Sequence, residues 1–348
     1  MPSLSEALKE TVLAAGIDLV GITSAEPLPV HRAVYPHRQP REVLAGARAV
    51  VVAGFCVAYE PRLVPSEPGR PRGRFTPYGS RIFEQMEAYC GKVIGDFLRE
   101  HGYQAVAAPN IPAKPAAVCA GLGSYGRHTV VITPELGSWV MFVCIVTDAP
   151  LAWTDALLDG TVCPEGCDAC RRACPTGALT GPYRIARTRC ITGWLWGNFV
   201  PAGLREKQET RLFGCGECLL ACPRNEHVVP RRSYPVPIDD FCDSPELIPL
   251  LDMTGDDFRR LIPAFPRRAG IDAIRGNAII ALGNIGDPAA VPALGRTLRH
   301  EKTQIRAYSA WALGRIGGAE AKTLLREALA GEEEPRVREE IEGALALF

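Results

Sequence analysis

Eight cysteines between residues 163 and 222 constrain this chain more than any other feature. They fall into two groups that each end in Cys-Pro, with a single cysteine between the groups. The first group is Cys163, Cys167, Cys170 and Cys174, the single residue is Cys190, and the second group is Cys215, Cys218 and Cys222. Spacings of two or three residues let successive thiolates converge on one cubane, whereas the cysteine before each proline ligates the partner cluster. The pattern therefore predicts two four-iron clusters.

The number of thiols agrees with this interpretation. Two four-iron clusters need eight thiolates, and the segment supplies eight. The crossover rule predicts one cluster on Cys163, Cys167, Cys170 and Cys222, and the other on Cys174, Cys190, Cys215 and Cys218. The first gap is one residue longer than usual, so Pro164 stands where the ligand normally falls. We expect Cys163 to reach its cluster through a longer loop.

Zinc and disulfides are the alternative uses of these cysteines. Cys-x2-Cys pairs also hold tetrahedral zinc, but the Cys-Pro endings are characteristic of two-cluster ferredoxins. The chain opens without a basic start or an apolar signal core. We therefore expect it in the reducing cytosol, where thiols persist. Five further cysteines in mostly apolar surroundings are interpreted as small buried hydrophobic residues, namely Cys56, Cys90, Cys119, Cys144 and Cys242.

The apolar pattern predicts three regions of structure. No apolar run reaches the ~18 residues that a membrane span needs. The longest runs, 49–55 and 140–146, are rich in β-branched residues and indicate buried strands, while 4–15 and 81–101 have helical patterns. We predict an α+β fold class. Its regions are an α/β domain over 1–157, a ferredoxin-like two-cluster domain over 158–232, and a linker with HEAT-like helical repeats over 233–348.

The last region contains an internal repeat. Residues 275–286 align with 306–317 at a period of 31 residues, and an imperfect third copy starts at Val337. The segments 292–298 and 322–329 supply the intervening helices. Such helix pairs cannot bury their apolar faces alone, so they stack into a short solenoid.

Charge is distributed unevenly along these repeats. Residues 258–316 contain ten Lys or Arg and three Asp or Glu, whereas residues 317–348 contain four Lys or Arg and eight Asp or Glu. A basic stripe suits a phosphate backbone, because each cation placed against a phosphate releases counterions. The alternatives are a solvated helix face, or arginines that bond neighbouring helix ends within the repeat. The residues predicted to contact nucleic acid are Arg267, Arg268, Arg275 and Arg306.

Over nearly its whole length the chain resembles the epoxyqueuosine reductases, which reduce the epoxide of a hypermodified tRNA base with cobalamin and two four-iron clusters. The resemblance rests on the cysteine groups, the terminal repeats and the segments 16–27, 40–54, 120–129, 137–139 and 147–150. It implies a nitroreductase-like, cobalamin-binding first domain, an external electron donor of flavodoxin or ferredoxin type, and tRNA as a partner. We expect a cytoplasmic monomer without membrane attachment. The implied cobalamin contacts are Gly121, Gly123, Ser124, Tyr125, Gly126, Arg127, His128, Thr129, Ser138 and Trp139.

The chain departs from this family at the proton donor. Epoxyqueuosine reductases place an aspartate before an Ala-Pro pair, whereas the corresponding residues 105–110 contain no acid, and 76–84 replace an expected Asp-Tyr-His element. Opening an epoxide leaves an alkoxide that must be protonated, and loss of a general acid costs roughly 10²–10⁴-fold in rate. The catalytic candidates come from the glycine-rich loop and are Tyr125, Arg127 and His128. For His128, a helix-start or core role is the alternative.

The segment 126–137 also resembles corrinoid reductive dehalogenases, which use a tyrosine with a basic neighbour. Three functions therefore remain. The first is a reductase of the epoxyqueuosine family acting on tRNA or a divergent substrate. The second is a cobalamin-dependent reductase of a small molecule, and the third is a corrin-free electron carrier or scaffold. The terminal repeats favour the first function over the second, and the intact glycine-rich segment disfavours the third.

Overall fold

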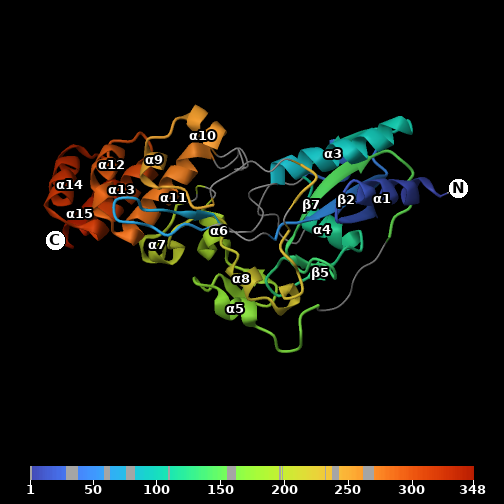
Figure 1. Cartoon of the computed structure of the whole chain (residues 1–348), viewed down its shortest axis with the longest axis horizontal. Helices are drawn as coiled ribbons and strands as arrows, with labels where there is room; N and C mark the ends of the chain where they lie inside the picture. Colours follow the sequence, from blue (N-terminus) through green and yellow to red (C-terminus); the bar gives the residue numbers. More distant parts are fainter. Residues whose placement is uncertain are drawn as a thin grey trace.

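A computed structural model shows a sheet-containing lobe at the N-terminal end and a helical lobe at the C-terminal end, with the cysteine-rich segment between them (Figure 1). None of the described helices combines the length and apolar character that a membrane crossing requires. The structure describes residues 2–28, 38–58, 63–75, 83–108, 110–154, 162–195, 197, 199–231, 233–236, 243–261 and 270–348.

The N-terminal lobe is built on an antiparallel sheet of four strands in the order β1-β2-β7-β4. Its strands are β1 (Leu19–Ser24), β2 (Ala49–Cys56), β4 (Ala105–Ala107) and β7 (Val140–Thr147). The two predicted strands are the central pair, β2 and β7, and every residue of β2 is buried. The prediction of buried strands is therefore confirmed.

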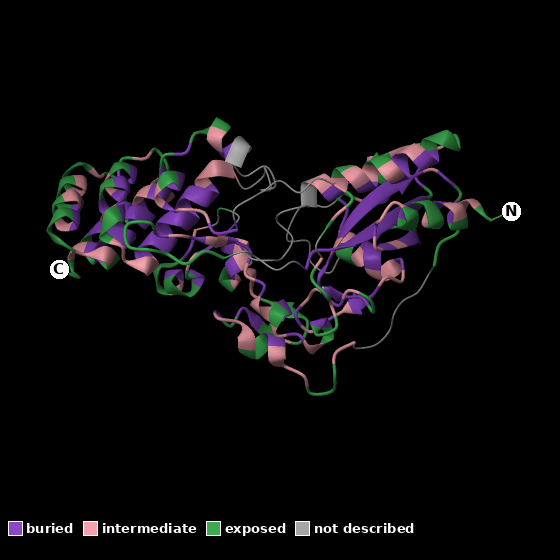
Figure 2. Cartoon of the chain, viewed as in Figure 1, coloured by how far each residue is buried: buried purple, intermediate pink, exposed green. Residues whose placement is uncertain are grey.

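Helices cover both faces of this sheet, which is why its central strands are apolar throughout. Successive side chains of a strand point to opposite faces. On one face Val51 packs with α1 (Leu4–Ala14) and α3 (Phe83–Glu100), and on the other Val50 packs with α4 (Ala113–Cys119). Figure 2 shows the buried strands between these helices. The helices predicted over 4–15 and 81–101 correspond to α1 and α3.

The cysteine-rich segment consists of short elements. Its helices are α5 (Ala169–Ala173), α6 (Ile191–Trp194), α7 (Ala202–Arg205) and α8 (Glu217–Leu220), and its strands are β8 (Leu179–Gly181), β9 (Arg184–Ile185) and β10 (Arg211–Phe213). Helices of one turn are not stable alone in water. Their positions must be fixed by packing and by whatever the cysteines bind.

The C-terminal lobe contains the helices that the repeat predicts. They are α11 (Gly270–Ile285), α12 (Val291–Thr297), α13 (Thr303–Ile316), α14 (Ala319–Gly331) and α15 (Pro335–Leu345), preceded by α9 (Ile248–Leu251) and α10 (Gly255–Leu261). The repeated glycines lie where α11, α13 and α15 touch. A Cβ on Gly283 would lie 2.9 Å from Cα of Ala312, and one on Gly314 would lie 2.8 Å from Cα of Ala344. The 31-residue period thus places a residue without a side chain at each contact.

Packing crosses the predicted domain boundaries. The helical core includes Trp194 and Leu212 from the cysteine-rich segment and Phe75 from the N-terminal region. Phe75 belongs to β3 (Arg74–Phe75), which pairs in parallel with β10. The domain ranges stay predictions, but parts of the first two regions are built into the third.

Candidate functional site

The first predicted group of thiols is brought together by two short helices. Cys170 lies in α5, and Cys222 follows α8, which packs on α5. Burial raises the pKa of the Cys222 thiol, and the neighbouring thiols of Cys163, Cys170 and Cys167 raise it further. Because such mutual repulsion falls with distance, it marks these four residues as one cluster of side chains. Cys163 belongs to this group despite the longer first gap.

The second predicted group surrounds a cavity of about 230 Å³. The thiols of Cys174, Cys190, Cys215 and Cys218 all line it. Burial raises the pKa of Cys218 to about 12, with further contributions from Cys215 and Cys190, and burial raises that of Cys215 to about 11. The thiols of Cys215 and Cys218 hold their protons unless a metal displaces them, so metal loading at these two residues releases protons. Cys170 of the first group also raises the pKa of Cys218, so the two groups are neighbours.

The cavity of the second group leaves room for a cluster among its four thiols. A zinc ion bound by four thiolates lies about 2.3 Å from each sulfur and leaves no cavity between them. Thiols set around a cavity suit a cluster that carries its own sulfides. Of the other cysteines, Cys56, Cys90 and Cys144 are buried in the cores and Cys119 is half-buried, while Cys242 lies outside the described residues.

The glycine-rich loop lies between the two groups of thiols. It carries β5 (Ser124–Tyr125), which pairs with β6 (Val131–Ile132). The backbone N–H of Arg127 donates to Sγ of Cys163 over 3.3 Å, and its guanidinium donates to the carbonyl of Cys167 over 2.7 Å. The next residue, His128, lines the cavity of the second group. Two consecutive residues therefore contact the two sites.

The predicted cobalamin contacts divide into two sets by burial. Gly121, Tyr125, Arg127 and Thr129 are half-buried, whereas six are buried, namely Gly123, Ser124, Gly126, His128, Ser138 and Trp139. Among these six, His128 lines the second cavity, whereas Ser138 and Gly123 are packed against protein. The N–H of Ser138 donates to Oδ1 of Asn225 over 2.7 Å, and a Cβ on Gly123 would lie 2.4 Å from the carbonyl oxygen of Ile132. Their position suits them to shaping the loop.

The three catalytic candidates differ in what their polar groups contact. The guanidinium of Arg127 is held by the Cys167 carbonyl. Burial and the charge of Lys114 lower the pKa of His128 to about 4, so its imidazole is neutral near pH 7. Burial raises the pKa of Tyr125 to about 12, so its hydroxyl keeps its proton. Among the three, Tyr125 best combines a retained proton with partial exposure.

The stretch that lacks the family's aspartate forms an edge of the sheet. Residues 105–107 are strand β4, and the N–H of Ala108 donates to the carbonyl of Cys144. Pro109 and residues 76–82 lie outside the described residues. The position of the missing acid is thus at the end of an edge strand, and the sequence places an apolar residue there.

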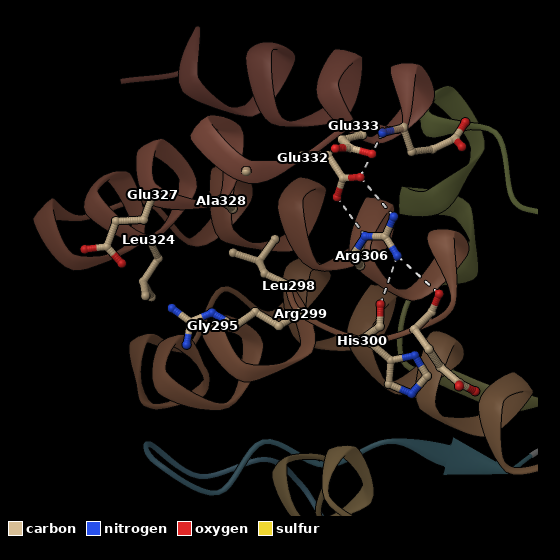
Figure 3. Close-up of a pocket in the computed structure, with 13 residues that line it drawn as sticks. Gly295, Leu298, Arg299, His300, Arg306, Leu324, Glu327, Ala328, Glu332 and Glu333 are labelled. Carbon is tan, nitrogen blue, oxygen red and sulfur yellow. Dashed lines mark hydrogen bonds and ion pairs between the residues drawn. The ribbon is translucent and has the colours of Figure 1, made fainter.

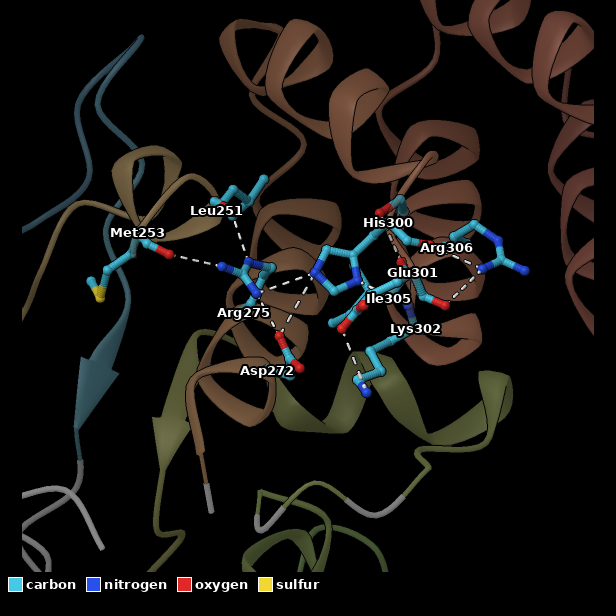
Figure 4. Close-up of polar contacts among 10 residues, drawn as sticks. Leu251, Met253, Asp272, Arg275, His300, Glu301, Lys302, Ile305 and Arg306 are labelled. Carbon is cyan, nitrogen blue, oxygen red and sulfur yellow. Dashed lines mark hydrogen bonds and ion pairs between the residues drawn. The ribbon is translucent and has the colours of Figure 1, made fainter. Parts of the chain in front are cut away.

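Arg275 and Arg306, predicted to face nucleic acid, are bonded within the repeats. Arg275 is 9% exposed and donates to the carbonyls of Leu251 and Met253 and to Asp272 (Figure 4). Arg306 forms a two-bond pair with Glu332 at 2.7 and 2.9 Å (Figure 3). This arrangement corresponds to the alternative of arginines that bond neighbouring helix ends. Arg267 and Arg268 lie outside the described residues.

The rest of the predicted basic stripe is largely neutralised in the structure. Of the six Lys and Arg in 258–316 whose side chains are described, five pair with acids, as Arg275–Asp272, Arg296–Asp252, Lys302–Glu301, Arg306–Glu332 and Arg315–Glu206. Arg299 instead lines a groove of about 700 Å³, shown in Figure 3, together with Glu327 and residues 332–334. Acids on its wall make this groove unfavourable for phosphate.

Two residues that shape the site were not among the predicted contacts. Lys114 of α4 lines the second cavity, and its ammonium donates to the carbonyl of Thr129 over 3.3 Å. Asn225 holds Ser138 through three hydrogen bonds and also donates to the carbonyl of Leu219. Lys114 lies 15 residues before Thr129 and Asn225 lies 87 residues after Ser138, so no spacing within the loop predicts them.

Three family models match successive parts of the chain. A reductive dehalogenase subunit matches residues 79–151, a 4Fe-4S double cluster binding domain matches 163–225, and HEAT repeats match 267–346. The second match spans all eight cysteines of the two groups. It supports iron–sulfur clusters as the groups that these thiols hold.

Curated relatives and solved structures extend the similarity to the full length. The epoxyqueuosine reductase of Bacillus cereus is 26% identical, with 99% of this chain and 98% of that protein aligned, and the one from Bacillus subtilis is 32% identical over 66% of this chain and 59% of its own length. A crystal structure of epoxyqueuosine reductase with an epoxyqueuosine-modified tRNA-Tyr stem loop superposes with a TM-score of 0.87 at 25% identity, covering 99% of this chain and 98% of that one. This chain and that crystal structure share the mixed α/β architecture with helical repeats at the C-terminal end.

Proposed function

Because the chain is an iron–sulfur protein homologous to the epoxyqueuosine reductases, we propose that it is an oxidoreductase that reduces an epoxyqueuosine-type base in tRNA or a related substrate. Electrons would come from an external donor of flavodoxin or ferredoxin type and pass through two four-iron clusters. The observation that carries the proposal is the pair of four-thiol sites beside the glycine-rich loop, within a chain that is homologous over its whole length.

The eight thiolates are proposed to hold the clusters in the crossover arrangement. Cys163, Cys167, Cys170 and Cys222 would hold the first, and Cys174, Cys190, Cys215 and Cys218 the second. The effect of Cys170 on Cys218 supports a short path between the clusters.

Cobalamin is proposed as the group that receives these electrons. The match to a reductive dehalogenase subunit over 79–151 and the full-length homology support it. When bound, cobalamin supplies a low-potential metal centre for the reduction, while the protein supplies position and a proton. Gly121, Tyr125, Arg127 and Thr129 are the loop residues whose exposure suits them to contact it.

Tyr125 is proposed as the proton donor in place of the missing aspartate. Its hydroxyl keeps its proton at neutral pH because burial raises its pKa to about 12. The variant Tyr125→Phe removes the proton and little volume. It should reduce turnover by roughly 10²–10⁴-fold while the iron content stays the same. Unchanged turnover would reject Tyr125 as the donor.

Transfer RNA is the proposed partner, and the chain is proposed to act as a cytoplasmic monomer. A homologue of this fold has been crystallised with a tRNA stem loop. Among the predicted contacts, Arg267 and Arg268 are retained in the proposal, while Arg275 and Arg306 are assigned to the stability of the repeats. The many thiols also suit a reducing compartment.

A small-molecule substrate is the second candidate, favoured by the missing acid and by Tyr125. The test is to reduce anaerobically prepared protein, loaded with iron, sulfide and cobalamin, and to offer it an epoxyqueuosine-modified stem loop or an aryl halide. Loss of one oxygen atom from the modified base, seen by mass spectrometry, supports the first function. Halide release without that change supports the second. A protein that is reduced but converts neither would contradict both and indicate an electron carrier.

A further inference from the structure

His128 has a buried ring nitrogen that no protein group bonds. The side chain is 2% exposed, and among the described residues its Nε2 has no hydrogen-bond partner. Its other nitrogen, Nδ1, accepts the backbone N–H of Val130 over 3.2 Å. An acceptor at Nδ1 requires the proton of the neutral ring to be on Nε2. A buried N–H donor without an acceptor costs ~1–3 kcal/mol, so an acceptor from outside the chain is expected.

The ring faces the cavity of the second thiol group. His128 lines that cavity with Cys174, Cys190, Cys215 and Cys218. The Nδ1 edge of the ring is turned to its own loop, and Cε1 lies 2.8 Å from where a Cβ on Gly126 would be. The edge that remains for the cavity therefore carries Nε2.

We propose that Nε2–H of His128 donates a hydrogen bond to a sulfur of the cluster held by Cys174, Cys190, Cys215 and Cys218, and thereby sets its reduction potential. This proposal rests on the assignment of a cluster to that cavity. Sulfides and thiolates are acceptors without protons, so they complement this donor. The added electron makes the cluster more negative, and a donor stabilises the reduced state more than the oxidised one, which raises the potential.

Two cations act in the same direction from other elements. Lys114 of α4 and Arg187 also line the cavity. Lys114 already donates to the carbonyl of Thr129. Their charges would act on the cluster through space, whereas His128 alone among the three adds a neutral N–H from the loop that also contacts Cys163 and Cys167. His128 is therefore a positioning and tuning residue, and it need not touch the substrate.

Two substitutions distinguish the roles of Nδ1 and Nε2 of the His128 ring. His128→Asn retains an acceptor near Nδ1 for the N–H of Val130 but lacks a donor at Nε2. His128→Gln places an amide N–H near Nε2 but lacks the Nδ1 acceptor. His101→Asn makes the same change at an exposed histidine that follows α3 and bonds the carbonyl of Phe97. The measurement is an anaerobic redox titration of the loaded protein, followed by electron paramagnetic resonance, with iron content determined for each variant.

The expected result is that His128→Asn keeps its iron and moves one of the two reduction waves to lower potential. At a fixed potential the ratio of reduced to oxidised cluster should fall roughly tenfold, equivalent to about 59 mV for one electron. His128→Gln should restore much of the shift, and His101→Asn should cause none. Full iron with unchanged potentials in His128→Asn would overturn the proposal, as would loss of one cluster from both variants, which would mark His128 as a packing residue. Wild-type protein with well under eight irons would contradict the cluster assignment itself.

Discussion

The helices that carry cysteines, α5 and α8, contain five and four residues, whereas α11 and α13 of the repeats contain 16 and 14. Both regions bury apolar residues and share one core, through Trp194 and Leu212. The short helices are not stable alone, because the conformational entropy lost in fixing a single turn outweighs the stabilisation from its hydrogen bonds. The long helices pack along their length on one another. The cysteine-rich segment should therefore depend on its bound metal, and the repeats should not.

Removal of iron tests this difference most strongly. Chelation under anaerobic conditions should abolish amide protection over 163–190 and 214–225, because the folding free energy of small metal sites comes largely from the metal. The amides of α11 and α13 should stay protected. Hydrogen exchange read by mass spectrometry separates the two regions. Equal loss of protection in both would contradict the comparison.

The contact between the two regions provides the next largest effect. Arg205 of α7 is fully buried, donates to both carboxylate oxygens of Glu340 of α15, and lies over the ring of Tyr308. Arg205→Ala leaves the Glu340 carboxylate without its partner and should lower the free energy of unfolding by ~3–5 kcal/mol. Urea denaturation of the wild-type protein and the variant measures this difference in the free energy of unfolding.

Arg296→Ala is the matched control for that substitution. Arg296 pairs with Asp252, and both side chains are more than half exposed. Its loss should cost no more than ~1 kcal/mol. Similar costs for the two variants would show that Arg205 does not join the regions.

The glycines of the repeat give a smaller effect with opposite signs at two positions. A Cβ on Gly314 would lie 2.7 Å from Cβ of Ala344, whereas one on Gly343 would meet nothing within 4 Å. Gly314→Ala should destabilise the lobe by ~1–3 kcal/mol through overpacking. Gly343→Ala, inside α15, should stabilise it by up to ~1 kcal/mol through helix propensity. Thermal unfolding of both variants checks the signs, and a stabilising Gly314→Ala would be inconsistent with close packing of α13 on α15.

Nucleic-acid binding should show the smallest effect in this comparison. Replacing Arg267 and Arg268 by Ala should weaken binding of a tRNA stem loop and reduce the salt slope by roughly one for each lost phosphate contact. Arg306→Gln should leave the slope unchanged, because that guanidinium is bonded to Glu332. Fluorescence anisotropy over a range of salt gives both slopes. A reduced slope in Arg306→Gln alone would show that the basic residues of the repeat helices bind the RNA, in place of Arg267 and Arg268.

Sequence patterns predicted the parts of the structure that repeat or alternate. The period of 31 residues located α11, α13 and α15, and β-branched runs located β2 and β7. The distribution of charge predicted the binding surface less well. Arg296 and Arg315 pair with Asp252 and Glu206, which are distant in sequence.

The tuning role of His128 also depends on tertiary contacts. The sequence placed this residue beside a cofactor, but its burial, its Nε2 without a partner among the described residues and its place in a cavity lined by four thiols are seen only in the fold. Spacing gives the ligands of a cluster. Cysteine spacing does not predict the residues that surround a cluster, because their positions depend on how α4, the glycine-rich loop and the cysteine-rich segment pack together.

The most direct test of the central claim is the metal content of anaerobically prepared Cys190→Ser, measured beside the wild-type protein and the buried-cysteine control Cys90→Ser. Two clusters with crossed ligands require about eight irons in the wild-type protein and in the control. Loss of one ligand of the second cluster should lower the iron of Cys190→Ser to about four, with one reduced-cluster signal left in its electron paramagnetic resonance spectrum. Eight irons in Cys190→Ser, or zinc in place of iron in the wild-type protein, would contradict the account.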